Sequence, residues 1–99
     1  MKFYQFRQNN SGGSFHHDAA AGIGYNVIIE ANSETEAICK AEDIGLYFDG
    51  VDSGDDCECC GDRWYGCYEI SEKDLLENAN MLGIPSYVHY VDGYIKELK

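Results

Sequence analysis

Two segments of the chain carry the residue types of a ligand-binding site. The first, Asn9 to Ser14, is polar and glycine-rich, and its consecutive backbone amides could hold an anion. The second, Arg63-Trp64-Tyr65, offers a guanidinium that can grip a phosphate and rings that can stack on a base. Arg7 precedes the first segment, and Arg7 and Arg63 are the only arginines in the chain. These features favour a nucleotide-like ligand held between the two segments.

The candidate ligand-binding residues are Arg7, Asn9, Asn10, Ser11, Gly12, Gly13, Ser14, Arg63, Trp64 and Tyr65. Each part of this set has a plainer interpretation. The glycine-rich segment matches neither the GxxxxGKS nor the GxGxxG phosphate motif, so by itself it is typical of a connecting loop. Either arginine could simply neutralise a nearby aspartate. The hypothesis therefore requires the two segments to meet in space, within one chain or across an interface between copies.

A crowded cysteine segment, Cys57-Glu58-Cys59-Cys60-Gly61, contains a CxxCG turn. In such a turn Cys57 and Cys60 can bind one metal ion, but a structural zinc needs four ligands. The other candidate ligands, none at a diagnostic spacing, are Cys39, Cys67, His16, His17 and His89. The sequence favours a metal-free turn whose thiols pack as small apolar groups, and zinc bound by Cys57 and Cys60 is the alternative.

Catalytic motifs are missing from the sequence. His16 and His17 lie next to each other in a polar segment, where histidines are usually just solvated, and no nucleophile motif or cofactor fingerprint accompanies them. Residues 49–62 contain six acidic residues, but their spacing does not match a calcium-binding EF-hand loop. We therefore expect a non-catalytic protein with no cofactor other than the alternative zinc.

The composition narrows the class of protein further. A chain of 99 residues has room for one domain, 1–99, and its 18 acidic against 7 basic residues give a net charge of −11. This charge repels a phosphate backbone, so we expect no direct binding to DNA or RNA. There is no apolar run long enough for a membrane span or for export, and the cysteine count of five is odd. We expect a soluble intracellular protein with reduced thiols and no membrane contact.

Hydrophobic patterning predicts the elements that must position these residues. The expected elements are strands over 3–7 and 25–31, a helix over 34–44, an irregular acidic segment over 49–62, a strand over 64–70, a helix over 72–82, and a hairpin of 87–91 with 94–98. Ser33 with Glu36 forms a capping box for the first helix, and Gly45 stops it. Ser71 with Asp74 is the corresponding signal for the second helix.

Two finer predictions follow from local spacing. Alternation along the strand 64–70 predicts that Trp64, Tyr68 and Ile70 share one face. Asp92-Gly93 is a strong signal for a two-residue hairpin turn, which would place Val91 opposite Tyr94. The order of elements predicts an α+β fold, a single small domain with a mainly antiparallel sheet of about five strands and two helices on one face.

Three stretches, residues 1–14, 44–50 and 56–65, resemble a family of small bacteriophage proteins. The hallmarks of that family are an FRQNNSGGSF-like opening and a DCxCCGDRW-like turn. The resemblance covers roughly the first 65 to 70 residues, and neither Cys67 nor the segment from Ser71 onward belongs to it. No settled biochemical function comes with the family. The resemblance implies a phage protein acting in the host bacterial cytoplasm, where small non-catalytic phage proteins commonly counteract host immunity.

The leading hypothesis is a binding protein that sequesters a nucleotide-derived signal molecule of the host defence. The first alternative is an acidic inhibitor that binds a host defence nuclease or effector, by imitating nucleic acid or by covering its working surface. The second alternative is a zinc-stabilised structural or interaction module. Uptake of a small nucleotide by the pure protein is expected only under the leading hypothesis.

Overall fold

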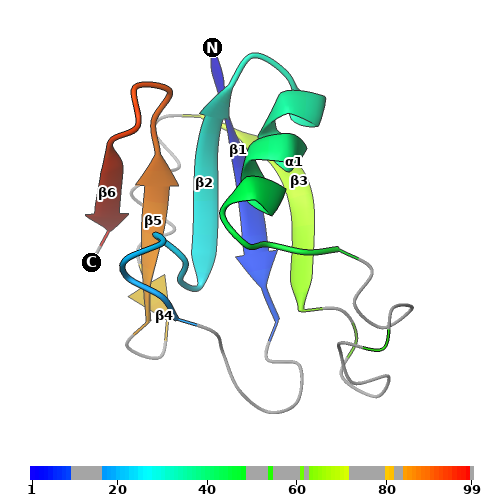
Figure 1. The fold of residues 1–99 in the computed structure, drawn as a ribbon, viewed down its shortest axis with the longest axis vertical. Coiled ribbons are helices and arrows are strands. Elements are labelled where there is room, and N and C mark those ends of the chain that lie inside the picture. Colours follow the sequence, from blue (N-terminus) through cyan, green and yellow to red (C-terminus); the bar gives the residue numbers. More distant parts are fainter. Residues whose placement is uncertain are drawn as a thin grey trace.

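A mixed β-sheet organises the structure (Figure 1). The computed structural model describes residues 1–9, 17–48, 54, 61, 63–71, 80–81 and 84–98. The strands are β1 (Lys2–Gln8), β2 (Asn26–Ala31), β3 (Trp64–Ile70), β4 (Asn80–Met81), β5 (Ile84–His89) and β6 (Ile95–Leu98). The longer strands lie in the order β3-β1-β2-β5-β6, and the two-residue β4 pairs with the start of β5.

The topology explains why the sheet is mixed. β1 pairs antiparallel with both β2 and β3, so it lies between them. β2 then pairs with β5 in parallel, with Val27 opposite Tyr87, whereas β5 and β6 form an antiparallel hairpin. The predicted pairing of the first two strands is confirmed, and so is the α+β class. The single parallel pair among the described strands makes the sheet mixed instead of purely antiparallel.

Helix α1 (Glu34–Asp43) covers one face of the sheet, which we call the helix face (Figure 1). Its predicted start is confirmed, because the Ser33 hydroxyl accepts a hydrogen bond from the Glu36 backbone N–H at 3.2 Å. At its other end Gly45 has a φ of +113°, a left-handed conformation that suits glycine and stops the helix. Ala37 and Ala41 are fully buried against the sheet, so small side chains let the helix pack closely.

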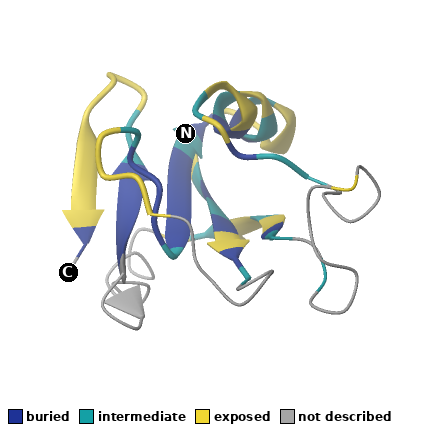
Figure 2. Cartoon of the chain, turned by 60° about the horizontal axis from the view of Figure 1, so that its bottom comes forward, coloured by how far each residue is buried: buried dark blue, intermediate teal, exposed yellow. Residues whose placement is uncertain are grey.

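Each face of the sheet carries a cluster of buried hydrophobic residues. The helix-face core contains Tyr4, Phe6, Ile23, Val27, Ile29, Ala31, Ala37, Ala41, Leu46 and Trp64. A second cluster on the opposite face contains Ile28, Val88 and Leu98, with Phe3, Ile70 and Tyr90 packed against it. Figure 2 shows that β2 and β5 are mostly buried, whereas β6 is largely exposed along its length. β2 therefore contributes side chains to both cores, as expected for a central strand.

The hairpin between β5 and β6 differs from its prediction by one residue. His89 pairs with Ile95, and the loop closes where Tyr90 N donates to Tyr94 O at 2.8 Å. The turn thus contains three residues, Val91 to Gly93, and Gly93 has a φ of +93°. A three-residue loop ending in a left-handed glycine is the next most common hairpin type after the two-residue turn. The predicted pairing of Val91 with Tyr94 is wrong, and the one-residue shift moves every β6 side chain to the other face.

Strand β3 matches its predicted range but not its predicted face. The register with β1 shifts between Gln5 and Arg7, so an extra residue of β3 is accommodated there. Trp64 consequently packs into the helix-face core, while Ile70 packs against the cluster on the opposite face. The prediction that these two side chains share a face is wrong, because a bulge breaks the strict alternation of a strand.

The predicted second helix, residues 72–82, can be compared with the structure only in part. Residues 72–79, 82 and 83 lie outside the described residues. Asn80–Met81 form strand β4 and pair with Ile84 and Pro85 of β5, so the helix does not extend to residue 82. Among the described residues there is one helix, α1, and the prediction of two helices on one face is corrected to one. The extended backbone before Pro85 agrees with the steric restriction that proline places on its predecessor.

Candidate functional site

Asn9, the described residue of the first predicted ligand segment, meets the second segment at one end of β1 and β3. Arg7 pairs with Tyr65 and Gln8 with Trp64, and the backbone N–H of Asn9 donates to the Arg63 carbonyl oxygen at 2.6 Å. The remaining predicted ligand residues, Asn10, Ser11, Gly12, Gly13 and Ser14, lie outside the described residues, as do Cys57 and Cys60. The described parts of the predicted site are therefore neighbours in space.

The Arg63 guanidinium is engaged by the protein itself. Its Nη1 donates to Gln8 Oε1 at 3.0 Å, and its Nε donates to the Tyr47 hydroxyl at 3.2 Å. Gln8 is 1% exposed, and its Nε2 in turn donates to the Gly24 carbonyl oxygen at 2.9 Å. These bonds tie the end of β1 to the segment before β2. Arg63 thus has a positioning role at this end of the sheet, with two of its N–H groups already used.

Trp64 occupies a different environment from the one predicted. Its indole is 3% exposed and packs in the helix-face core with Tyr4 and Phe6. A base cannot stack on a ring that is enclosed in this way without opening the core. The structure therefore assigns Trp64 to packing, and Tyr65 is the aromatic residue of the segment that reaches the surface, with an exposed fraction of 36%.

Arg7 and two tyrosines form an exposed set that we call the arginine–tyrosine surface: Arg7, Tyr65 and Tyr68. Directly paired residues in antiparallel strands share a face, so Arg7 lies on the same face as Tyr65, and Gln5 on the same face as Tyr68. This is the face opposite to α1. Within the described part of the chain, Arg7 makes no ion pair or side-chain hydrogen bond. The surface offers an available guanidinium beside aromatic rings.

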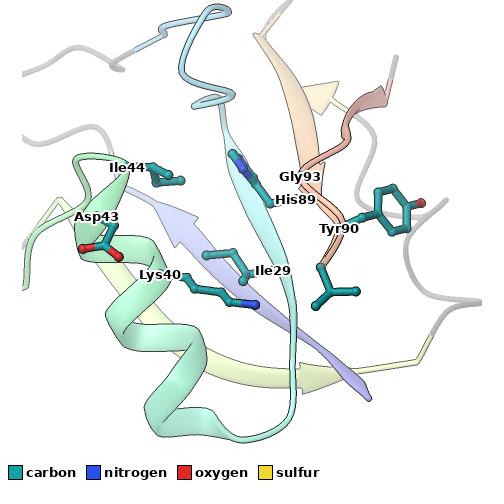
Figure 3. Close-up of a pocket in the computed structure, with 8 residues that line it drawn as sticks. Ile29, Lys40, Asp43, Ile44, His89, Tyr90 and Gly93 are labelled. Atoms are coloured by element: carbon teal, nitrogen blue, oxygen red, sulfur yellow. The ribbon is translucent and has the colours of Figure 1, made fainter.

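A pocket that the sequence reasoning missed lies on the helix face, between α1 and the β5–β6 hairpin (Figure 3). Its volume is about 210 Å³. We call it the helix–hairpin pocket, and it is lined by Ile29, Lys40, Asp43, Ile44, His89, Tyr90, Val91 and Gly93. These residues come from β2, α1 and the hairpin. No single segment contains a recognisable motif, so the pocket exists only through the tertiary arrangement.

His89 is a half-buried titratable group in the lining of this pocket. Its Nε2 donates to the Gly22 carbonyl oxygen at 2.8 Å, and burial lowers the pKa of its imidazole. A side chain at Gly22 would lie 2.7 Å from His89 Cε1, and Gly22 has a φ of +73°, so glycine is required for this contact. Alternation along β5 could have placed His89 beside Tyr87 on one face. It could not have indicated the Gly22 contact, which joins residues 67 apart.

A second histidine contact lies on the same face of β5. His17 Nε2 and the Tyr87 hydroxyl are 2.8 Å apart. The pKa of Tyr87 is raised, first by burial and then by the negative charges of Glu97 and Asp18, so its hydroxyl stays protonated at neutral pH. Together the two histidine contacts fasten residues 17–22 onto β5, which makes them structural bonds of the fold.

The candidate zinc ligands among the described residues are dispersed. Cys39 lies exposed on α1, and Cys67 lies half-buried on β3 against the helix-face core. Burial, together with the charge of Glu34, raises the pKa of Cys67 to about 11. In the described part of the chain, no three His, Cys, Asp or Glu side chains lie together as metal ligands would. Three of the candidate zinc ligands, His16, Cys57 and Cys60, lie outside the described residues.

The buried His89 predicts a specific pH dependence of stability. Its pKa in the folded protein lies below the ordinary 6.5, so the unfolded chain binds the proton more readily. Stability is then fully present above about pH 6.5 and falls as the pH decreases through that value. Urea unfolding between about pH 7.5 and about pH 5 measures the slope. His89→Gln is expected to flatten it, and equal slopes for wild type and His89→Gln would contradict the assignment.

The fold and the two sites define a small α+β domain with a cationic and aromatic surface on one face and a pocket on the other. The chain belongs to the family described as a domain of unknown function, DUF7296, whose family model matches residues 1–98. No curated protein sequence and no solved structure matches the chain. Within the described residues, no helix has the length and apolar character needed to cross a lipid bilayer.

Proposed function

We propose that this protein binds and sequesters a small nucleotide-derived anion without converting it. Its site is the arginine–tyrosine surface with the neighbouring Asn9 and Arg63. The resemblance to small phage proteins supplies the biological setting of the proposal: the protein would act in the host bacterial cytoplasm and lower the concentration of a nucleotide signal used in bacterial immunity.

The observation that carries the proposal is the position of Arg7. Its guanidinium is exposed, it faces Tyr65 across the β1–β3 pair, and within the described residues no carboxylate neutralises it. A planar guanidinium with free N–H groups matches the geometry of a phosphate, and an adjacent tyrosine ring can stack on a base. Nucleotide-binding sites commonly combine these two interactions, one with the phosphate and one with the base.

An anionic ligand can bind only where positive side chains offset the negative charge of the whole protein. With a net charge of −11, the protein's own field opposes an approaching anion. Both of its arginines lie at the same end of β1, because Arg7 is on that strand and Arg63 is bonded to Asn9 through its carbonyl oxygen. The two arginines therefore place positive charge at this end of the sheet, and binding there should weaken as salt is added.

The test is calorimetry with cyclic dinucleotides and cyclic ADP-ribose as probes. Arg7→Ala is expected to weaken binding about 30-fold, since a charge-assisted hydrogen bond of about 2 kcal/mol is lost. Arg7→Lys retains the charge but not the fork and should recover only part of the affinity. Lys96→Ala removes an equal charge from the exposed β6 strand and should leave affinity unchanged.

Two results would overturn the proposal. One is an Arg7→Ala variant that binds as tightly as wild type while the protein remains folded. The other is the absence of measurable uptake for every probe in this set. Recovery of a chemically altered ligand after long incubation would instead show catalysis, and it would contradict the non-catalytic part of the proposal.

The acidic-inhibitor alternative is favoured by one observation on α1. Glu34, Glu42 and Asp43 are all exposed along this helix, so its outer surface is acidic and free of packing constraints. An acidic surface of this kind pairs with a basic cleft and speeds association at low salt. Under this alternative, Glu42→Gln would weaken binding to a basic partner protein, whereas Arg7→Ala would not.

A further inference from the structure

The helix–hairpin pocket lies apart from the proposed nucleotide surface. It is on the helix face, whereas Arg7 and Tyr65 lie on the opposite face. At about 210 Å³ it is smaller than the pockets of about 300 to 1,000 Å³ that hold drug-sized ligands, so it suits a single side chain. An inference about this pocket therefore does not rest on the proposed nucleotide binding.

Apolar groups form much of the pocket wall. Ile29 is 1% exposed, and Figure 3 shows it between the Lys40 side chain and the His89 ring. Ile44 and Val91 also line the pocket. The carbon stem of a lysine packs as an apolar group while its ammonium is held elsewhere. The lining therefore favours an apolar side chain over a polar one.

Apolar side chains continue from the pocket onto the hairpin. Val91 lines the pocket and is 50% exposed. Ile95 is 38% exposed and pairs with His89, so these two side chains share the helix face. Glu30 Oε1 accepts the Val91 backbone N–H at 3.0 Å, which fastens the hairpin turn to β2. Exposed apolar groups that border a pocket are typical of a surface that binds another protein.

The charged groups around the pocket are mostly acidic. The Lys40 ammonium already pairs with Glu36 Oε1 at 3.2 Å, and this bond lowers the pKa of Glu36. Asp43 is an exposed residue of the lining, and Asp92 is exposed in the hairpin turn. Together with Glu30, these residues place four carboxylates around one ammonium. The surface therefore attracts a basic partner and repels an acidic one.

The same charge argues against other occupants. A second copy of this chain would bring a further net charge of −11 to an acidic surface. Nucleic acids and anionic lipids carry negative charge and are repelled in the same way. The occupant that fits both the apolar lining and the acidic surroundings is a basic segment of another protein.

We propose that the helix–hairpin pocket anchors a basic protein partner through one apolar side chain, such as leucine. The anchor packs on Ile29 and Ile44 inside the pocket and against Val91 at its border. Lysines or arginines that flank the anchor in the partner face Asp43 and Asp92. This is a protein-binding surface, separate from the arginine–tyrosine surface.

The probe for this surface is a capped synthetic peptide with a central leucine between two pairs of lysines. It is titrated into the protein and followed by NMR through the methyl resonances of Ile29, Ile44 and Val91, for which saturable shifts are expected. A peptide with alanine in place of leucine keeps the charge but lacks the anchor, so it should bind about tenfold more weakly. A peptide with glutamates in place of the lysines should leave the methyl groups unshifted.

Two charge-reversal variants of the protein locate the contact. Asp43→Lys should weaken binding of the leucine peptide about fivefold, and lysine is tolerated there because cations are favourable at the C-terminal end of a helix. Glu69→Lys makes the same change of charge on β3, where the carboxylate forms an exposed ion pair with Lys2. Because salt screens charges at that distance, Glu69→Lys should leave the affinity unchanged at physiological ionic strength.

Four results would overturn this proposal. The leucine peptide leaves the methyl groups unshifted, or the alanine peptide binds as tightly as the leucine peptide. Asp43→Lys and Glu69→Lys weaken binding equally, which would show a dependence on net charge alone. The methyl groups shift on dilution of the protein without peptide, which would assign the surface to a second copy of the chain. Arg7→Ala should leave peptide binding intact, so failure here is distinguishable from failure of the proposed nucleotide site.

Discussion

Gly24→Ala is expected to lower the free energy of unfolding by about 3 kcal/mol, because the added methyl group has no space. A Cβ at Gly24 would overlap the carbonyl oxygen of Pro85 and would lie 3.0 Å from Tyr87 Cε2. The oxygen cannot easily retreat, since it accepts the backbone N–H of Tyr25 at 3.0 Å. The substitution therefore forces apart β5 and the segment that crosses it.

Gly93→Ala provides the comparison for this prediction. Gly93 has a φ of +93°, and a Cβ there would have no heavy atom within 4 Å, so only backbone strain is added. That strain costs about 1 kcal/mol. Urea unfolding followed by the fluorescence of the buried Trp64 measures both variants. A loss of stability for Gly24→Ala no greater than that for Gly93→Ala would contradict the steric explanation.

The elements predicted best are those specified by local chemistry. The capping box at Ser33 and the stop at Gly45 fix both ends of α1 within a residue of the prediction. Alternating apolar residues fix β1, β2 and β3 equally well. Such signals depend on a few adjacent side chains, so they can be interpreted without knowing the rest of the fold.

The predictions from the sequence are wrong where contacts between segments far apart in the chain determine the structure. The parallel pairing of β2 with β5 joins Val27 to Tyr87, and no local pattern specifies which strands become neighbours. The hairpin register changed by one residue because Gly93 adopts a left-handed bulge, for which Asp92-Gly93 gives the same signal as a two-residue turn. Bulges also separated Trp64 from Ile70, since strict alternation assumes an unbroken register.

The same distinction applies to the two sites. The sequence could identify Arg7 and Arg63 as candidate ligand-binding residues, because the chain has only these two arginines and each is next to an aromatic residue in the sequence. It could not show that Trp64 would be buried and Tyr65 exposed, which depends on the bulge in β3. The helix–hairpin pocket was beyond prediction for a further reason. Lys40 and His89 are ordinary residues in their own segments, and only tertiary packing brings them to the lining of one pocket.

Gln8→Leu is expected to lower the free energy of unfolding by about 3 kcal/mol, although leucine has nearly the volume of glutamine. Gln8 is 1% exposed and joins two separate groups: it donates to the Gly24 carbonyl oxygen and accepts from Arg63 Nη1. Leucine leaves both partners without these bonds in a site from which water is largely excluded, and one of them belongs to a charged group. Urea unfolding measures the loss.

Gln5→Leu is the matched control, since it makes the same change on the same strand. Gln5 is only half-buried, and its Nε2 donates to Asn26 Oδ1 at 2.7 Å on the opposite face, so we expect a smaller loss of about 1 kcal/mol. If the two variants are equally stable, the bridging role of Gln8 is contradicted.

Gln8→Glu separates the two bonds that Gln8 makes. A carboxylate still accepts from Arg63, and more strongly, but it can no longer donate to the Gly24 carbonyl oxygen, which it repels. The Arg63 Nε–H resonance should therefore stay near its wild-type position in Gln8→Glu and move in Gln8→Leu.

The same variants should differ in nucleotide binding. The Arg63 carbonyl oxygen accepts the Asn9 backbone N–H beside Arg7, so Gln8→Leu should weaken nucleotide binding in the calorimetric test, whereas Gln8→Glu should largely preserve it. Loss of binding in both variants would instead trace the effect to Gly24 and the segment before β2.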